Sequence, residues 1–106
     1  MRGLKKRRIV SIAEFSIHPI GTGTSVGKYV KQALEAISKI KGLEYKVTPM
    51  ATILEAKDVQ TILRAVEASH SALRAMGARR ISSILRIDER LDIPRMMRDK
   101  TESIKD

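Results

Sequence analysis

The stretch Leu43-Glu44-Tyr45-Lys46-Val47-Thr48-Pro49-Met50-Ala51-Thr52-Ile53-Leu54-Glu55 decides the fold. Apolar and polar residues alternate over 43–48, which is typical of a strand with one buried face. Pro49 marks a turn, and 50–55 predict a second strand. Because no helix separates the two strands, we expect a hairpin, with strand 43–48 at an edge of the sheet.

A helix is predicted on the N-terminal side of this hairpin, over residues 25–41. Its apolar residues recur at helical spacing and form one stripe. Thr24 or Ser25 is a suitable N-cap, and Gly42 is placed to end the helix. The stripe consists of Val26, Tyr29, Val30, Ala33, Leu34 and Ile37.

A second helix is predicted on the C-terminal side, over residues 58–76. Asp58 is placed to cap its first turn, and Gly77 follows its last turn. His70 lies on the apolar stripe of this helix. We therefore expect His70 to be partly buried, with its hydrogen bonds satisfied inside the protein.

Two further strands flank the helices, over 8–17 and 80–88. Both side-chain rows of 8–17 are largely apolar, which predicts a central strand covered on both faces. Pro19 and the glycines after it end that strand. Ile93-Pro94 predicts the start of a short terminal helix.

The order strand, helix, strand, strand, helix, strand is the βαββαβ, ferredoxin-like pattern. It predicts an α+β sandwich: an antiparallel four-stranded sheet with two helices on one face, plus the short C-terminal helix. The other face of the sheet is bare yet half apolar. Such a face favours a subunit interface, so we expect a homo-oligomer.

Composition limits the class of protein. The 106 residues fit one domain, and the absence of cysteine excludes disulfides and thiolate chemistry. No apolar run is long enough to span a membrane, and the N-terminus lacks the apolar core of a signal peptide, so we expect a cytoplasmic protein. Residues 1–7 are expected to be a disordered basic tail, and 8–106 the domain.

The segment from Ser16 to Ser25 is the best candidate for a functional site. Gly21-Thr22-Gly23-Thr24-Ser25-Val26-Gly27-Lys28 resembles a phosphate-binding loop in composition. Its glycine spacing does not fit that loop, and Tyr29 stands where a magnesium-binding hydroxyl belongs. The alternatives that remain are a loop with free N–H groups for an anion and a plain loop with an N-cap.

Glu14 lies in the middle of the first strand, among apolar neighbours. A carboxylate in such a place is costly unless it is paired. If the last strand lies beside the first, Arg86 can pair with Glu14 across the two strands. The pair fits either a salt bridge at an interface or a polar spot that holds a small ligand. Two lone histidines, His18 and His70, make a poor metal site, so we expect no metal and no cofactor.

Several segments together resemble the thiamine-binding-protein-like family of small ferredoxin-fold proteins. They are Ala13–Ser16, Pro19–Thr22 with Ser25, Thr48–Glu55, Ala68–His70, Gly77–Ile81 and Ile87–Arg90. The resemblance runs from about Ile9 to Lys105. It implies a homotetramer built as a dimer of dimers that binds thiamine or its hydroxymethylpyrimidine moiety without catalysis.

The same resemblance implies which residues lie in or near the ligand site. They are Glu14, Ser16, Pro19, Gly21, Thr22, Ser25, Thr52 and Glu55. The sequence departs from the family pattern at Ala51 and Ala56, where glycine is favoured. The extra methyl group of Ala51 is expected to narrow the pocket.

Other functions stay open beside this one. A structural oligomer without a ligand is one alternative. A nucleic-acid binder is another, because the chain has 21 lysines and arginines but only 12 acidic residues, which gives a net charge of +9. The aromatic-bearing RNP signature with which ferredoxin-like RNA domains stack bases is missing. An enzyme is not expected, because no nucleophile–base pair or metal cluster can be assembled from the sequence.

Overall fold

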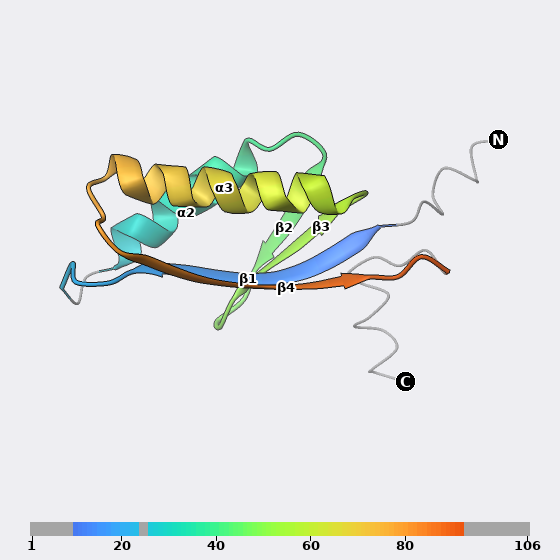
Figure 1. The fold of residues 1–106 in the computed structure, drawn as a ribbon, viewed down its shortest axis with the longest axis horizontal. Coiled ribbons are helices and arrows are strands. Elements are labelled where there is room, and N and C mark those ends of the chain that lie inside the picture. Colours follow the sequence, from blue (N-terminus) through green and yellow to red (C-terminus); the bar gives the residue numbers. More distant parts are fainter. Residues whose placement is uncertain (1–9, 24–25, 93–106) are drawn as a thin grey trace.

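The computed structural model describes residues 10–23 and 26–92. The basic tail, the cap candidates Thr24 and Ser25, and the terminal helix predicted at Ile93 lie outside these residues. The elements follow in the order β1 (Ser11–Pro19), α2 (Gly27–Ser38), β2 (Leu43–Val47), β3 (Thr52–Ala56), α3 (Val59–Ala75) and β4 (Ile81–Glu89) (Figure 1).

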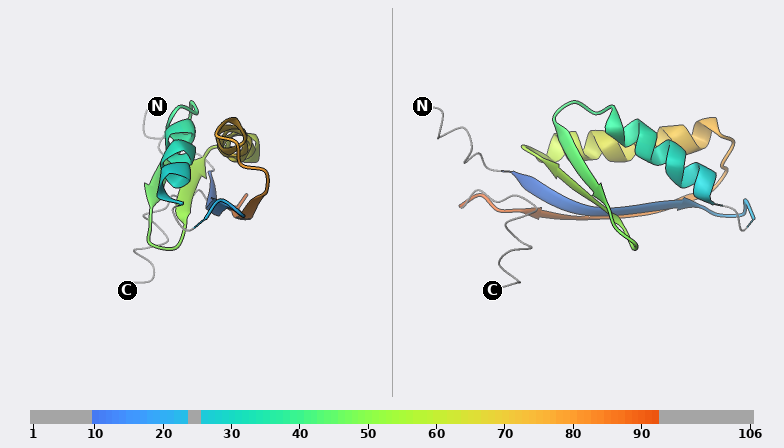
Figure 2. Two further views of the ribbon diagram at one scale, coloured as in Figure 1. Left: turned by 90° about the vertical axis from the view of Figure 1, so that its left-hand side faces the viewer. Right: turned by 180° about the vertical axis from the view of Figure 1, so that it is seen from behind.

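The four strands form one sheet in the order β2-β3-β1-β4, and every neighbouring pair is antiparallel. The two helices lie side by side on one face of this sheet, as the end-on view makes clear (Figure 2). The predicted βαββαβ fold is thus confirmed. Also confirmed are the central place of β1 and the edge position of β2.

Alternation along β1 sends its side chains to opposite faces of the sheet. Ala13 and Phe15 point toward the helices and are almost completely buried. Glu14, between them, points away from the helices and is exposed. The larger of two core clusters consists of small and aliphatic residues packed around a single phenylalanine: Ala13, Phe15, Ile37, Leu54, Ala56, Ile62 and Ala65.

The ends of α3 are those that the sequence predicts. The carboxylate of Asp58 accepts hydrogen bonds from the backbone N–H of Thr61 at 2.8 Å and from its hydroxyl at 2.6 Å. These bonds stabilise the charged form and hold the pKa of Asp58 below its usual value. Gly77 follows the C-cap with a φ of +94°, a conformation that glycine adopts without strain.

The predicted bounds of α2 are too wide at both ends. The N-cap is Val26, which offers no side-chain hydrogen bond. At the other end, the N–H groups of Lys39 and Ile40 bond to carbonyls three residues back. This tighter turn ends the helix at Ser38, and Gly42 (φ +83°) instead serves the turn into β2.

The strand bounds also shift, by one to three residues, because pairing with other strands sets them. β1 continues to Pro19 rather than stopping at Ile17, since Pro19 still pairs with Ile81 of β4. A proline is tolerated at the end of a strand, where its missing N–H breaks no further ladder bond. Of the helices in the described part of the chain, none has the length and apolarity needed to cross a membrane.

Candidate functional site

A cavity of about 190 Å³ lies between α2 and the sheet, at the end where the β2–β3 hairpin turns. Its lining comes from four elements, β1, α2, β2 and β3, and from the turn between the last two. The lining residues are Phe15, Ser16, Ile17, Val30, Ala33, Leu34, Ile37, Val47, Thr48, Pro49, Met50, Ala51 and Thr52. The stretch 48–52 therefore belongs entirely to the wall of this cavity.

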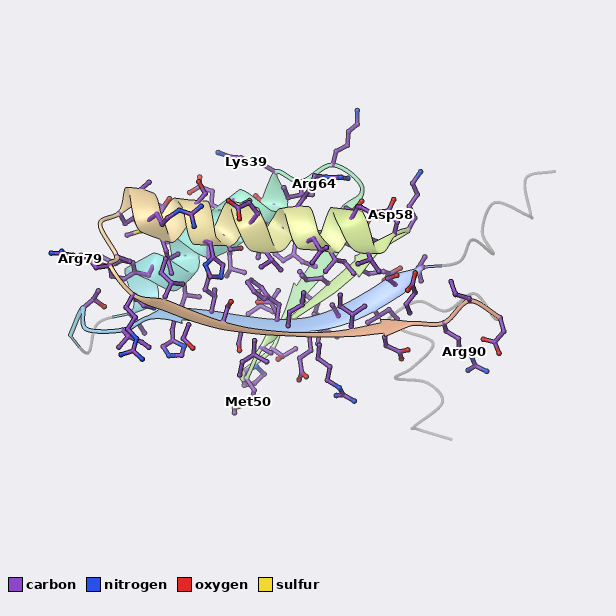
Figure 3. All side chains as sticks on the ribbon, viewed as in Figure 1. Lys39, Met50, Asp58, Arg64, Arg79 and Arg90 are labelled. Atoms are coloured by element: carbon purple, nitrogen blue, oxygen red, sulfur yellow. The ribbon has the colours of Figure 1, made fainter. Side chains whose placement is uncertain are left out.

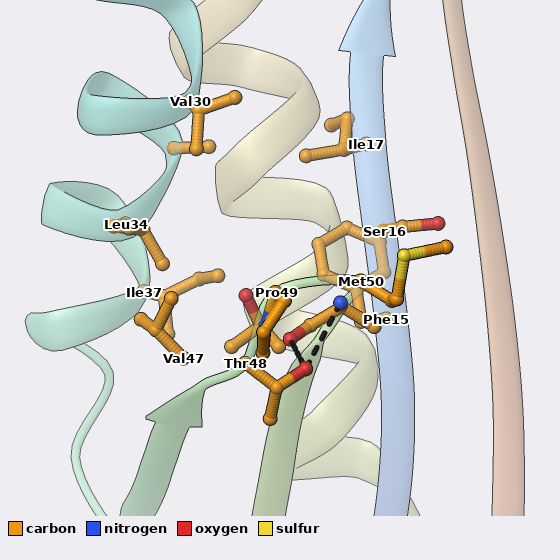
Figure 4. Close-up of a pocket in the computed structure, with 13 residues that line it drawn as sticks. Phe15, Ser16, Ile17, Val30, Leu34, Ile37, Val47, Thr48, Pro49 and Met50 are labelled. Atoms are coloured by element: carbon orange, nitrogen blue, oxygen red, sulfur yellow. Dashed lines mark hydrogen bonds between the residues drawn. The ribbon is translucent and has the colours of Figure 1, made fainter. Parts of the chain in front are cut away.

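The walls of the cavity are mainly aliphatic (Figure 4). Val30, Leu34 and Ile37 extend from α2 toward the sheet, and Ile17 faces Val30 from β1. The ring of Phe15 lies beside the hairpin, and its side chain is only 1% exposed. Such walls favour an apolar or aromatic ring as the occupant.

Two threonines supply hydroxyl groups to the hairpin side. The Thr48 hydroxyl donates to the carbonyl of Ala51 at 2.6 Å and accepts from its N–H at 3.1 Å, which fixes the turn. Thr52 lies opposite Phe15 in the sheet register, so it faces the helices. Within the described residues, the Thr52 hydroxyl has no hydrogen-bond partner, which leaves it available to a ligand.

The opposite face of the sheet carries a second depression, of about 230 Å³. Glu14 and Arg86 are direct partners in the β1–β4 register, and their side chains approach to 3.8 Å. The predicted cross-strand pair is thus confirmed. The Glu14 side chain is 53% exposed and that of Arg86 84%, so the attraction between them is weak in water.

The structure separates the predicted site residues into three groups. Ser16 and Thr52 line the helix-side cavity, although the Ser16 hydroxyl points away from α2 (Figure 4). Glu14 and Glu55 lie on the opposite face of the sheet. The remaining described members, Pro19, Gly21 and Thr22, lie at the end of β1, and Ser25 is outside the described residues. No single cavity collects all of them.

The loop after β1 has a feature of its own. Gly21 and Gly23 have φ values of +85° and +90°, so the chain reverses through conformations that suit glycine. The hydroxyl oxygen of Thr22 is buried and finds no hydrogen-bond partner within the described residues. The loop meets β4 through a bond from the Ile20 N–H to the Arg80 carbonyl at 2.8 Å.

Sequence analysis missed a serine–histidine pair. Nε2 of His70 on α3 lies 2.7 Å from the hydroxyl oxygen of Ser83 on β4. The prediction that His70 is partly buried and satisfied is confirmed. Ser83 belongs to the row of β4 side chains that faces the helices. A polar residue in that row, together with His70 on the apolar stripe of α3, is the sequence signal that could have predicted the bond. Neither residue lines the two cavities described above.

No group of three or more histidine, aspartate or glutamate side chains in residues 10–23 and 26–92 is arranged to hold a metal ion.

Met50, at the tip of the hairpin, is 86% exposed. It lies beyond β1 on the side away from the helices in the view of Figure 3. The described polar chemistry of the helix-side cavity is thus limited to hydroxyl and backbone groups.

Comparison with known proteins points to one family. A family model described as "Thiamine-binding protein" matches residues 13–105. A UPF0045 protein of Methanothermobacter thermautotrophicus is 41% identical over 95 residues, which cover 89% of this chain and 95% of that protein. A UPF0045 protein of Bacillus subtilis is 33% identical, with 90% of this chain and 94% of the relative covered.

Solved structures agree in fold. The crystal structure of a hypothetical protein from Methanocaldococcus jannaschii superposes with a TM-score of 0.80 at 39% identity, covering 91% of this chain and 96% of that one. A structure from Thermotoga maritima, whose description names thiamine biosynthesis or salvage as its candidate role, gives a TM-score of 0.75. It is 21% identical, with 90% and 98% of the two chains covered, and so supports the fold alone.

Proposed function

This chain belongs to the thiamine-binding protein family, and on that premise we propose that it binds thiamine or its hydroxymethylpyrimidine moiety. We propose further that it does so without catalysing a reaction. The observation that carries the proposal is the helix-side cavity, whose wall contains the whole stretch 48–52. That stretch is part of the sequence by which the chain resembles the family.

The chemistry of the cavity supports a heteroaromatic ligand. Phe15 and the aliphatic residues of α2 offer flat and apolar contact to a ring. The Thr52 hydroxyl can both donate and accept, which matches the mixed donors and acceptors of an aminopyrimidine. Ala51 lines this cavity without filling it, since a volume of about 190 Å³ remains.

Isothermal titration calorimetry with thiamine and with hydroxymethylpyrimidine tests the proposal. We expect saturable heat with at least one of them, together with a rise in the midpoint of thermal unfolding, because a ligand that binds only the folded state stabilises it. The absence of both heat and thermal shift with either compound would contradict the proposal.

The non-catalytic part is supported by the placement of polar groups. The His70–Ser83 pair is the described arrangement nearest to a base and a nucleophile, and it lies outside the cavity wall. A bound ligand in the cavity would meet hydroxyl and backbone groups, which bind but do not by themselves drive bond cleavage. Recovery of unchanged ligand after prolonged incubation is the expected result.

We also propose that the protein assembles as a homotetramer. The open face of the sheet combines the aliphatic residues Ile12, Ile53 and Ile84 with the Glu14–Arg86 pair. Ile84 on this face is 69% exposed, which is a large exposure for an isoleucine. A purely structural oligomer without ligand is the alternative, and the calorimetry described above separates the two.

A further inference from the structure

We infer that the outer edge of β2 is a docking surface for β2 of a second copy of this chain, so that the two sheets join into one continuous sheet. The surface is the strand Leu43–Val47. The inference is independent of the proposed ligand, and it names a contact other than the open face of the sheet. Three observations carry it: the outward backbone groups of β2, the order of its charges and the exposure of its apolar side chains.

The first observation is that β2 has a hydrogen-bonded neighbour on one side only. Among the described strands it is the outermost, next to β3 (Figure 2). The Thr48 N–H donates to the Ala51 carbonyl at 2.9 Å, so this pair belongs to the hydrogen-bonded pairs of the hairpin. Such pairs alternate along an antiparallel ladder, and the backbone groups of the residues between them point away from β3. These residues are Leu43, Tyr45 and Val47, and a further strand can pair with them.

The second observation is that the charges of β2 suit an antiparallel copy of the same strand. When two copies meet with Tyr45 opposite Tyr45, Glu44 of each copy lies opposite Lys46 of the other. Opposite charges in this relation stabilise strand pairing, whereas a register centred on Glu44 or on Lys46 places like charges together. Within the described residues of one copy, neither of these two side chains has an ion-pair partner. The charges thus select one register of a symmetric contact.

The surroundings of Glu44 favour the same register. Glu44 lies opposite Glu55 in the β2–β3 pairing, and like charges that face each other across two strands repel. Lys46 of the second copy lies on the other side of Glu44, so its positive charge offsets this repulsion. A lysine on an edge strand commonly discourages further pairing. Here the lysine meets a carboxylate in the Tyr45-centred register, so it discourages the other registers instead.

The third observation is that the apolar side chains of β2 are poorly covered in one copy. Tyr45 is 40% exposed and Val47 is 56% exposed. In the Tyr45-centred register the two tyrosines lie side by side, and Leu43 of each copy lies opposite Val47 of the other. Apolar pairs across neighbouring strands stabilise a sheet. Val47 also lines the helix-side cavity, so Leu43 of the second copy covers a residue of that cavity wall.

Sedimentation velocity of the full chain tests the contact through its charges. Lys46→Glu places glutamates opposite each other, and we expect it to weaken association at the β2 edge at least about tenfold, because like charges in register repel. The double variant Glu44→Lys with Lys46→Glu exchanges the charges and should associate like the wild type. Arg79→Glu makes the same change of charge at an exposed position between α3 and β4 and is the control. Dissociation that the exchange does not reverse would overturn the inference.

The outcomes separate this contact from the proposed tetramer. A tetrameric wild type that Lys46→Glu leaves intact overturns the inference while the tetramer stands. A dimeric wild type that Lys46→Glu splits into monomers supports the inference and contradicts the tetramer. A monomeric wild type contradicts both.

Cysteine variants test the register directly, since the chain has no cysteine of its own. The Cα atoms of a hydrogen-bonded antiparallel pair lie about 5.5 Å apart, a separation that a disulfide can span. Tyr45→Cys should therefore give a disulfide-linked dimer under mild oxidation. Lys46→Cys should stay unlinked, because position 46 faces position 44 of the other copy and is too far from its own equivalent. Linking of both variants, or of neither, would overturn the inference.

Discussion

At the scale of single residues, Thr52 is the polar side chain on which the proposed ligand binding depends most. Its side chain faces the helices beside Phe15, and its hydroxyl has no protein partner within the described residues. Thr48, four positions earlier, has a hydroxyl that is already occupied by both polar groups of Ala51. Under the proposed function, one threonine of the hairpin contacts the ligand and the other holds the turn.

Replacing Thr52 with valine removes the hydroxyl and keeps the shape of the side chain. We expect the affinity for hydroxymethylpyrimidine to fall about two- to tenfold, the value of one hydrogen bond. Calorimetry measures this change. Thr52→Ser keeps the hydroxyl and is the matched control; if both variants bind like the wild type, Thr52 does not contact the ligand.

The pKa of Asp58 leads to a prediction about how stability depends on pH. Its pKa in the folded protein is lowered from the usual 3.8 by the side-chain and backbone hydrogen bonds of Thr61. A group with a lowered folded pKa stabilises the protein above its unfolded pKa, and this contribution disappears as the pH falls through the folded pKa. Asp58→Ala should therefore lower the midpoint of thermal unfolding at neutral pH, and the difference from the wild type should shrink below about pH 4. A difference independent of pH would show that the charge of Asp58 is not what stabilises α3.

Sequence reasoning at this scale succeeded where the partner is close in the chain. Asp58 and Thr61 are three residues apart, so the cap is visible in the sequence. The His70–Ser83 bond joins a helix to a strand, and no pattern among residues close in the sequence predicts it. Glu14 and Arg86 were paired correctly because the fold itself puts their strands side by side.

At the scale of elements, β2 forms one wall of the cavity while remaining an edge strand. Val47 lines the cavity and yet is 56% exposed. Its neighbour Lys46 points to the other face of the sheet and is also exposed. A large side chain at position 47 therefore enters the cavity, and the same side chain at position 46 lies on the other face of the sheet and serves as a control.

Val47→Phe is expected to fill part of the cavity and to weaken ligand binding at least tenfold, without lowering the midpoint of thermal unfolding, because a half-exposed edge position tolerates a larger side chain. Lys46→Phe adds the same ring on the opposite face and should bind like the wild type. Calorimetry and a thermal scan on both variants measure the two effects. Equal loss of binding in both variants would place the ligand elsewhere.

Element types follow from the sequence, whereas the grouping of site residues does not. Alternation and helical spacing are local, so all six central elements were predicted in the right order. Both side-chain rows of β1 are largely apolar, so the sequence could not show that Phe15 faces the helices and Glu14 the open face. The expectation of one ligand site that includes both Glu14 and Thr52 therefore joined residues that lie on opposite faces of the sheet.

At the scale of the whole molecule, the two faces of the sheet differ in what covers them. The helices cover one face (Figures 1 and 2). On the other, Ile84 is 69% exposed and stands two positions before Arg86 on β4. An aliphatic residue beside a charged pair on a broad surface suits a second copy of the chain, because the pair can fix the register of the contact.

Sedimentation velocity tests the proposed assembly. We expect the wild type to sediment as a tetramer at micromolar concentration, and Ile84→Asp to shift the distribution toward smaller species, because the new carboxylate would be buried without a partner. Leu63→Asp changes a 48% exposed leucine on α3, on the helix layer, and is the matched control. A monomeric wild type would contradict the proposal, and an equal shift in both variants would assign the contact to another surface.

The central position of β1 also has a consequence for how the chain acquires its structure. β1 pairs with β3 and β4. Its first residue, Ser11, lies opposite Glu89, which is 78 positions further along the chain. The β2–β3 hairpin, in contrast, closes across a short turn. Joining distant segments costs chain entropy before any contact repays it, and such topologies fold more slowly than local ones. We therefore expect β1, the central strand, to complete its pairing only when the two ends of the described chain come together.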